Sequence, residues 1–294
     1  MGRLPQQSAN YSVDLHSHST ASDGALAPEA LVLHASNQGV THLALTDHDT
    51  VAGIEPARQA ARALGLTLIP GVELSVLWEK HTIHIVGLGI RPDHPALTQF
   101  MDQVRQARQD RAERICYKLA KLGVNIDWRA VETHSIGRSH IAHALVACGW
   151  VKDHAKAFQY YLKMGKKAYV KAQWPALEEG VAAILAAGGV AVLAHPGSYR
   201  LSNGKLNRLL QAFRGAGGTA IEVITAAHTH PNDQGAAARA RRFQLYASCG
   251  SDFHHPDWRW RQLGRLAKLP PDLTPVWQAP PLQHYFRSTD GTHC

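Results

Sequence analysis

Histidine and acidic residues gather in this sequence where short apolar runs end. The 294 residues include 19 histidines, and histidine is the commonest metal ligand among protein side chains. In the segment DLHSHSTASDG, His16 and His18 stand two residues apart at the end of an expected strand, so they point to one face and can share a metal ion. Asp23, in the loop that follows, can fold back to supply an oxygen ligand. Taken alone, the two histidines could equally be incidental surface residues.

The segment LALTDHD brings three polar residues to the end of a second apolar run, where a packed core has no place for them. Of these, His48 is the strongest candidate ligand. The flanking Asp47 and Asp49 could coordinate a metal, cap the next turn or support a ligand, and the sequence does not decide between these roles.

A third region, IPGVELSV followed by HTIHIVGLG, places Glu73 at an expected strand end and His84 inside the next expected strand. A carboxylate among apolar residues needs a partner, so Glu73 is a candidate ligand. His84 is preferred to His81, which lies where the strand begins. The alternative for His84 is a core histidine bonded to a backbone carbonyl.

Two more apolar runs, VAVLAHPG and SCGSDFHH, end in further candidates. A purely structural explanation of all five segments would need five independent coincidences, so we expect one shared metal centre. Its nine candidate ligands are His16, His18, Asp23, His48, Glu73, His84, His195, Asp252 and His254. One zinc site needs only three or four protein ligands, so nine suit two or three ions that clamp the attacking and leaving oxygens of a phosphoryl transfer. Imidazole and carboxylate without thiolate are compatible with manganese, iron or zinc, and the carboxylates favour manganese.

Basic residues form a second set of candidates. Four arginines recur every third residue along one expected helix, so neighbours lie close together while the row drifts around the helix; they are Arg105, Arg108, Arg111 and Arg114. Arg138, followed by Ser139, adds another guanidinium, whose planar fork suits a phosphate group. We expect Arg105, Arg108 and Arg138 to bind phosphate, with a solvated basic face as the alternative. The formal net charge of +8 favours polyanionic partners.

Seven short apolar runs are the strands that would position these groups. They span residues 12–15, 42–45, 67–69, 82–86, 190–194, 220–224 and 244–247. Helical patterns lie between most of them, at 28–38, 54–64, 175–187 and 234–242. Strands that alternate with helices predict a parallel α/β architecture, in which functional groups gather at the carboxyl ends of the strands.

One region interrupts this alternation. Residues 96–122 are expected to form one long basic helix, and residues 139–162 are helical again, with no strand between. We therefore expect a first part of a barrel at 1–95, a helical insertion domain at 96–165, and the second part of the barrel with a C-terminal tail at 166–294. The last ~25 residues are expected to be irregular.

Composition excludes several classes of protein. The hydrophobic content of 45% and charged content of 18% are typical of a globular chain, and no apolar run reaches the ~18 to 20 residues of a membrane span. The N-terminus shows no apolar signal segment, so a cytoplasmic location is expected. The four cysteines lie far apart without a C-x-x-C pair, which argues against a disulfide framework or a thiolate zinc module.

The ordered set of motifs resembles the PHP (polymerase and histidinol phosphatase) superfamily over nearly the whole chain. These motifs are D-L-H-x-H, T-D-H-D, G-V-E, H-I-V-G-L, A-H-P-G and G-S-D-F-H. Within the 96–165 region and at its end, R-x-x-R, G-R-S-H and Y-L-x-x-G-K-x-x-Y-V resemble the branch of 3′,5′-nucleoside bisphosphate phosphatase and the 5′-to-3′ exoribonuclease RNase AM. Ala27 departs from the Thr that commonly caps the first helix in this family.

The resemblance implies a distorted seven-stranded β/α (PHP-type) barrel with a helical insertion. It implies a cluster of two or three divalent ions, usually manganese, held by the nine residues named above. It also implies that Arg105, Arg108, Arg138 and Ser139 line the site of a substrate phosphate. No membrane and no obligate protein partner are implied.

We therefore hypothesise that a metal-bound hydroxide, assisted by His48, Asp23 and His254, attacks a phosphorus attached to a 3′-oxygen while the arginines hold the 5′-phosphate. A nucleoside 3′,5′-bisphosphate then gives a 5′-mononucleotide and phosphate. A 5′-phosphorylated RNA gives a 5′-mononucleotide and a shorter RNA that again carries a 5′-phosphate, so cleavage repeats from the 5′ end. His140 and His228 are candidates for protonating the leaving oxygen.

Two other functions stay open at this stage. A small-metabolite phosphatase, such as a histidinol phosphatase, would use the same metals but would not need a second phosphate anchor. A non-catalytic PHP module would keep the barrel alone, and the intact ligand set argues against it.

Overall fold

A single sheet of seven strands forms the centre of the protein, in a computed structural model that describes residues 11–131, 133–226 and 230–287. The strands follow one another around the sheet in chain order. They are β1 (Val13–Asp14), β2 (His42–Leu45), β3 (Thr67–Trp78), β4 (His81–Leu88), β5 (Val190–Leu193), β6 (Ala220–Thr225) and β7 (Tyr246–Gly250). The Leu15 amide donates to the Cys249 carbonyl at 3.0 Å, and Ser17 bridges to Phe253. The first and last strands therefore meet, and the sheet is nearly closed into a barrel.

The expected parallel arrangement is correct for four strand pairs and wrong for β4. This strand runs antiparallel to both β3 and β5. The reason is the connection: only two residues separate β3 from β4, and so short a link joins antiparallel strands, whereas a parallel pair needs a crossover of a dozen or more residues. Glu79, one of the two, lies in the left-handed region with a φ of 51°, which suits a tight hairpin.

β3 is much longer than the expected run of 67–69, because the chain stays extended through Pro70 and Gly71. Glu73 therefore lies inside a strand, not at the strand end that the sequence suggested. Beyond its regular end, the chain of β2 continues beside β3, with an isolated bridge between His48 and Glu73. That extension brings a candidate ligand from each strand into neighbouring positions.

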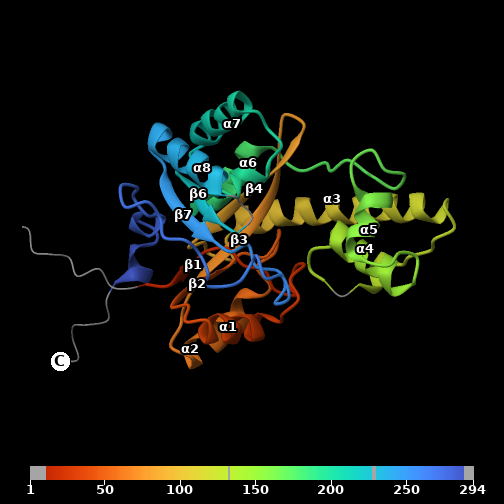
Figure 1. Cartoon of the computed structure of the whole chain (residues 1–294), viewed down its shortest axis with the longest axis horizontal. Coiled ribbons are helices and arrows are strands. Elements are labelled where there is room, and N and C mark those ends of the chain that lie inside the picture. Colours follow the sequence, from red (N-terminus) through yellow and green to blue (C-terminus); the bar gives the residue numbers. More distant parts are fainter. Residues whose placement is uncertain (1–10, 132, 227–229, 288–294) are drawn as a thin grey trace, which may run out of the picture.

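Helices cover the outside of the sheet. They are α1 (Pro28–Asn37), α2 (Ile54–Ala63), α6 (Leu177–Ala186), α7 (Asn203–Gly215) and α8 (His230–Phe243). Figure 1 shows α1 and α2 on one side of the barrel and α6, α7 and α8 on the opposite side. α7 is not among the helices expected from the sequence, although its buried residues follow the spacing of an amphipathic helix; they are Leu206, Leu209, Leu210 and Phe213.

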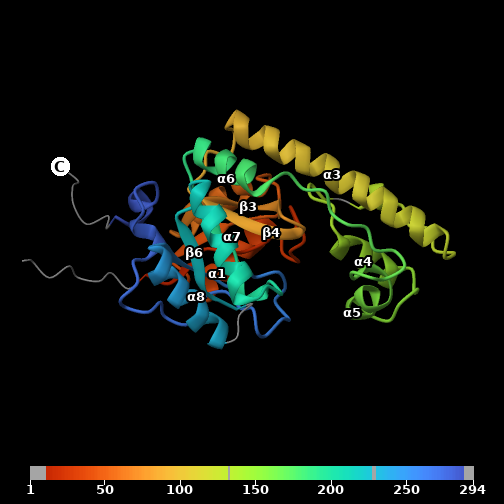
Figure 2. The ribbon, with the colours of Figure 1, turned by 90° about the horizontal axis from the view of Figure 1, so that it is seen from above.

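The chain between β4 and α6 is helical. It contains α3 (Pro95–Ala120), α4 (Arg138–Ala147), α5 (His154–Ala157) and short helical turns at Trp128–Ala130 and Phe158–Leu162. In Figures 1 and 2, α3 extends away from the barrel and α4 and α5 lie beside its outer half. The expected continuous helical stretch of 139–162 is broken between α4 and α5, where Gly149 has a φ of 72°.

α3 takes part in two hydrophobic cores. Near its start, Leu97, Phe100 and Val104 pack into the cluster beneath the barrel helices. Further along, Ile115 and Leu119 belong to a separate cluster with buried residues of the helical region. α3 is thus one rigid element that is anchored in the barrel at one end and carries the remaining helices at the other.

The C-terminal segment lies on the side of the barrel away from these helices (Figure 1). It is irregular, as expected, apart from short helical turns at Val276–Gln278 and Gln283–Phe286. It is also packed: Val276 and Leu282 are completely buried in the cluster that fills one end of the barrel. Among the described residues, no helix combines the length and the apolar character needed to cross a membrane.

Candidate metal centre

The nine side chains expected as ligands lie together at one end of the barrel. They come from the ends of β1, β2, β5 and β7, from inside β3 and β4, and from the loop before α1, which carries Asp23. Each contacts at least one other: the imidazole of His254, for example, lies 3.3 Å from Asp23, and that of His18 lies 3.4 Å from Asp252. Residues that are up to 238 positions apart in sequence, such as His16 and His254, therefore share one site.

Glu73 occupies the middle of this centre and is completely buried. Imidazole nitrogens of five histidines lie between 2.9 and 3.3 Å from its two carboxylate oxygens. The five are His16, His18, His48, His84 and His195. Glu73 and these imidazoles would hold metal ions together at this point, with the carboxylate supplying negative charge to them.

Three overlapping groups of ligand atoms are each compact enough to hold one cation. Within each group the atoms lie no more than 4.8 Å apart. The groups are His18, Asp23, His48 and His254; His16, His18 and Asp252; and His48, Glu73 and His84. Because His18 and His48 each belong to two groups, the three positions are neighbours in one cluster.

Several polar atoms of the centre are buried without a hydrogen-bond partner. They include His18 Nδ1, Asp23 Oδ1, His48 Nδ1, Glu73 Oε2 and His195 Nδ1. In addition, the Nε2 atoms of His16 and His18 face each other at 3.1 Å. Buried polar atoms normally have partners, and converging unpartnered nitrogen and oxygen atoms are what divalent cations bind. The residues present therefore fit a cluster of divalent metal ions.

The ionisation of the side chains in the centre also fits the binding of cations. Burial by itself raises the pKa of Glu73, yet His48, His84 and His16 hold that pKa well below its usual range. Burial likewise opposes the charge of His254, but Asp23 and Asp252 raise its pKa to about 9. The carboxylates are thus ionised and require positive charge beside them, which protonated imidazoles or metal ions can supply.

A second layer of residues orients the ligands. Glu222 accepts a 2.6 Å hydrogen bond from Nδ1 of His16 and another of 2.6 Å from the His195 amide. The first bond fixes the His16 tautomer so that Nε2 points to the centre with its lone pair. Arg261 forms an ion pair with Asp252 at 2.7 Å, and the Tyr199 hydroxyl accepts from the His84 amide at 2.9 Å.

The two aspartates that flank His48 have distinct partners. Asp47 accepts hydrogen bonds from the amide and hydroxyl of Ser19 and from the hydroxyl of Ser22, and so holds the loop that carries Asp23. Asp49 accepts from the Ser75 amide at 2.6 Å and from the Arg108 guanidinium at 2.8 Å. Both carboxylates thereby fix loops around the centre.

Three arginines from the helical region form what we call the arginine cluster: Arg108, Arg111 and Arg138. The guanidiniums of Arg108 and Arg111 lie over the ring of Trp174, at 5.2 and 5.7 Å. Burial, followed by repulsion from Arg138 and Arg108, lowers the pKa of Arg111 to about 9. Burial also lowers the pKa of Arg138, with Arg108 adding to the effect. An anion placed among them would relieve this repulsion.

The other two residues expected to bind the substrate phosphate, Ser139 and Arg105, lie in different surroundings from each other. Ser139 follows Arg138 in the first turn of α4 and is partly exposed. Arg105 is exposed, pairs with Asp102 at 2.5 Å and lines a pocket of about 540 Å³ beside Trp128. Within the described part of the chain, no contact joins Arg105 to the metal centre. The spacing of the arginines did not reveal this difference, because a row of i+3 residues turns slowly around its helix.

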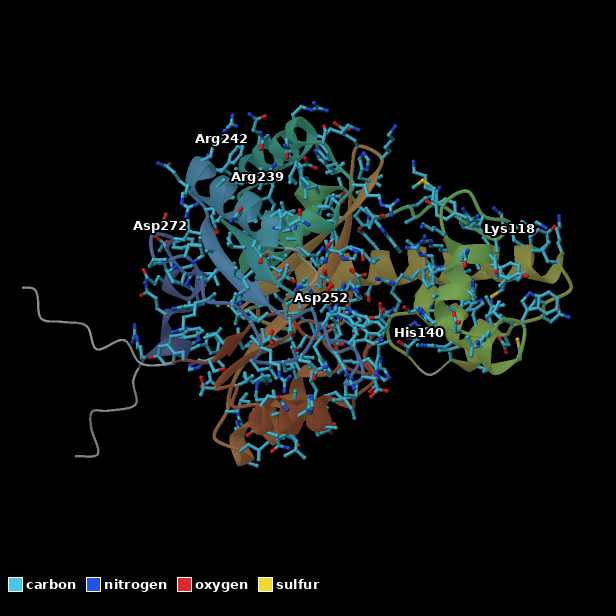
Figure 3. All side chains as sticks on the ribbon, viewed as in Figure 1. Lys118, His140, Arg239, Arg242, Asp252 and Asp272 are labelled. Atoms are coloured by element: carbon cyan, nitrogen blue, oxygen red, sulfur yellow. The ribbon has the colours of Figure 1, made fainter. Side chains whose placement is uncertain are left out.

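His140 connects the helical region to the barrel. Its Nδ1 accepts from the Gly137 amide at 3.0 Å, so its Nε2 donates to the Ser22 carbonyl at 2.9 Å. Both ring nitrogens are therefore engaged, which does not favour His140 as the proton donor for a leaving group. His228 lies outside the described residues. Figure 3 shows His140 on the helical region and Asp252 on the barrel.

Arg261 and Tyr199 were missed by the sequence analysis. Neither belongs to a motif with a recognisable metal-binding spacing, and their partners, Asp252 and His84, are identified only once the chain is folded. Glu222 carried a weak signal, since it is a carboxylate in the apolar run of 220–224.

Comparisons with known proteins find relatives over most of the chain. The model of the PHP domain family matches residues 14–226. The chain is 45% identical over 277 residues to the 5′-3′ exoribonuclease Rnm of Escherichia coli, covering 92% of this chain and 94% of the relative. It is 42% identical over 272 residues to the 3′,5′-nucleoside bisphosphate phosphatase of Chromobacterium violaceum, covering 90% and 95% of the two chains.

Two solved structures have the same fold. An amidohydrolase from Chromobacterium violaceum, with bound sulfate and no metal, superposes with a TM-score of 0.86 at 40% identity, covering 93% of this chain and 96% of the other. A protein of Bifidobacterium adolescentis described as a metal-dependent phosphoesterase superposes with a TM-score of 0.78 at 29% identity, covering 94% and 97%.

Proposed function

Since the chain belongs to the PHP domain family, we propose that it hydrolyses the phosphate ester at the 3′-oxygen of 5′-phosphorylated nucleotides. A nucleoside 3′,5′-bisphosphate gives a 5′-mononucleotide and phosphate, and a short 5′-phosphorylated RNA is degraded from its 5′ end. The names of the two relatives, a bisphosphate phosphatase and a 5′-3′ exoribonuclease, fit the same bond cleavage. In both reactions the leaving group is the 3′-oxygen of the 5′-mononucleotide, and the substrates differ in whether the phosphorus also carries the rest of an RNA chain.

The observation that carries the proposal is the pairing of a metal centre with a separate anion site. Nine converging ligands suit any phosphate ester, whereas the arginine cluster adds a second position for phosphate. The two sites are connected directly, because Arg108 bonds to Asp49 and the preceding residue, His48, faces Glu73. A substrate with two phosphates, one at each site, explains both features.

The three ligand groups would hold two or three divalent ions, which we propose are manganese. Such ions, when bound, neutralise charge on the scissile phosphate and activate water. Mixed imidazole and carboxylate ligation favours manganese, although iron and zinc accept the same donors. The chain's own contribution is a buried, preformed arrangement of donors at the end of a rigid barrel.

Three of these residues are proposed to assist the attacking water. Asp23 Oδ1 lies 3.3 Å from His254 Nε2 and 3.9 Å from His48 Nε2. A carboxylate oxygen at this position can accept a hydrogen bond from the water and so orient it toward the phosphorus. The two imidazoles in turn hold the carboxylate in place.

The 5′-phosphate is proposed to bind at Arg108, Arg138 and Ser139. Guanidiniums form charge-assisted bonds to phosphate oxygens, and a doubly charged phosphate would offset the mutual repulsion of the arginine cluster. Arg105 is proposed to act further out, at the pocket beside Trp128, where it can meet an incoming phosphate. The net charge of +8 would raise the encounter rate with a polyanion.

These proposed roles belong to two different parts of the chain. We propose that residues 96–165 are an inserted domain that supplies the phosphate anchor, and that residues 1–95 and 166–294 supply the barrel and its metals. The separate hydrophobic cluster around Ile115 and Leu145 supports this division.

Release of phosphate from adenosine 3′,5′-bisphosphate tests the proposal. The purified protein would be stripped with a chelator and resupplied with manganese, iron or zinc in parallel. Formation of AMP and phosphate that depends on metal and is lost in His48→Ala is the expected result. Metal binding without release, together with faster hydrolysis of histidinol phosphate, would replace the proposal with a small-metabolite phosphatase.

A further inference from the structure

A row of stacked rings leads from the metal centre to the protein surface. The rings of His18 and His254 lie 4.1 Å apart at an interplanar angle of 28°. His254 stacks in turn on Trp258, at 5.9 Å and 27°, and Trp258 stacks on Trp260, at 6.1 Å and 8°. Trp260 ends the row with 67% of its surface exposed.

The loop that carries the two tryptophans is held in place by its own bonds. The side-chain amide of Gln262 donates to the carbonyls of Pro256 and Trp258, both at 2.9 Å. Arg261 fixes the loop to the centre through its ion pair with Asp252. The exposed indole is thus presented by an ordered segment, so little conformational entropy is lost when a ligand stacks on it.

We propose that Trp258 and Trp260 form a stacking platform for the bases of single-stranded RNA that follow the scissile phosphate. This inference rests on the proposed function and adds the surface that receives the longer substrate. Nucleic-acid bases stack on flat aromatic side chains whatever their sequence, and the exposed Trp260 indole, supported by Trp258, offers a surface that continues the row of rings outward. Arg259 and Arg265 are exposed in the same segment and add positive charge for the backbone.

The connectivity of the site decides which part of the RNA reaches the platform. The arginine cluster joins the metal centre through Asp49 beside His48, whereas the platform joins it through His254. A 5′-nucleotide that extends from the arginines to the metals leaves its scissile phosphate at the centre. The chain beyond that phosphate then continues past His254 onto Trp258 and Trp260. A nucleoside bisphosphate ends at the scissile phosphate and does not reach the platform.

Substitution of Trp260 tests the inference, because this indole does not touch a metal ligand. The kcat/KM of the manganese-loaded protein would be measured on a 5′-phosphorylated penta-adenylate and on adenosine 3′,5′-bisphosphate. We expect Trp260→Ala to lose about tenfold on the RNA and less than about twofold on the bisphosphate. Trp260→Phe, which keeps a ring, should recover most of the loss. Trp150→Ala is the matched control, since Trp150 is an exposed tryptophan of the helical region.

A second measurement keeps the inference independent of catalysis. Binding of the same labelled RNA to chelator-treated protein would be followed by fluorescence anisotropy. If the protein hydrolyses neither substrate, the proposed function fails while weaker RNA binding by Trp260→Ala still supports the platform. Equal RNA affinity and equal kcat/KM in Trp260→Ala and wild type would overturn it. So would a change of oligomeric state confined to Trp260→Ala, because the indole would then be a contact between copies of the chain.

Discussion

Arg108 of α3 and Asp49 of the barrel form a buried ion pair, with the guanidinium Nε 2.8 Å from the carboxylate. The Asp49 side chain is completely covered and that of Arg108 is 10% exposed. Asp49 follows the candidate ligand His48 directly, so this pair links the helical region to the metal centre. The arginine also donates from Nη2 to the Ser75 hydroxyl and from Nη1 to the Ile136 carbonyl. Four of its five N–H groups are thus used inside the protein, and one N–H of Nη1 is left for the phosphate oxygen that we propose it binds.

The first prediction concerns the stability of this link. Arg108→Ala leaves the Asp49 carboxylate buried without its counter-charge, and we expect the free energy of unfolding to fall by about 3 to 5 kcal/mol. Urea denaturation measures the change. Arg58→Ala is the control, since it breaks an exposed pair with Glu55 and should cost less than about 1 kcal/mol. Similar losses in the two variants would show that the buried pair is not a structural link.

The second prediction concerns Glu222, which orients His16 and the His195 backbone. Glu222→Ala frees the His16 ring to rotate, and we expect manganese affinity to fall about 10- to 100-fold with the fold retained. Calorimetric titration of the chelator-treated protein measures this affinity. Glu178→Ala, a change on the exposed face of α6, should bind manganese like wild type. Unchanged affinity in Glu222→Ala would mean that the carboxylate does not position the ligand.

The sequence was sufficient to predict which side chains meet at the barrel end, and the reason is physical. His16, His48 and His195 each follow a short apolar run, and such runs end at one edge when strands alternate with helices. The direction of β4 could not be predicted in the same way. Its two-residue connection was hidden, because Pro70 and Gly71 suggested the end of a strand that in fact continues to Trp78.

The partners of the arginines could not be predicted either. Arg105 and Arg108 have the same residue type and lie three positions apart, yet one is exposed and the other is buried against Asp49. Their spacing gives the angle between the two side chains around the axis of α3, but it does not show which face of α3 packs against the barrel. Arg261 is a stronger example, because nothing in its local sequence indicates that it will pair with Asp252.

The third prediction is a pH dependence of the contact between His140 and Ser22. Burial lowers the pKa of His140, so the folded protein holds the neutral ring while the unfolded chain still binds the proton. The stabilisation is therefore complete above the unfolded value of ~6.5 and is lost as the pH falls through the lower folded pKa. Chelator-treated wild type should lose more unfolding free energy between pH 7.5 and 5.5 than His140→Gln does.

The exposed His284 provides the control for this experiment. His284→Gln should keep the pH dependence of wild type, because its ring makes no buried contact that protonation would break. The interpretation is rejected when His140→Gln and wild type lose the same free energy over this pH range.

The fourth prediction concerns recognition of the 5′-phosphate. Arg138→Ala should lower kcat/KM for adenosine 3′,5′-bisphosphate about 10- to 100-fold, the effect of one charge-assisted bond, and should change kcat/KM for 3′-AMP little. Arg105→Ala should have a smaller effect, since Arg105 lies outside the arginine cluster. Arg214→Ala, at the exposed end of α7, serves as the control. If Arg138→Ala lowered kcat/KM equally for both substrates, Arg138 would not be a residue that recognises the 5′-phosphate.

The fifth prediction concerns metal removal. A ligand that binds only the folded protein stabilises it by about 2.7 kcal/mol at a concentration 100 times its Kd, so manganese should raise the Tm of chelator-treated protein in proportion to its occupancy. Glu73→Ala should lose most of this rise, because the Glu73 carboxylate faces five of the imidazoles. Elemental analysis should find two or three ions per wild-type chain and fewer in the variant. A single ion per wild-type chain, unaffected by Glu73→Ala, would contradict the shared centre.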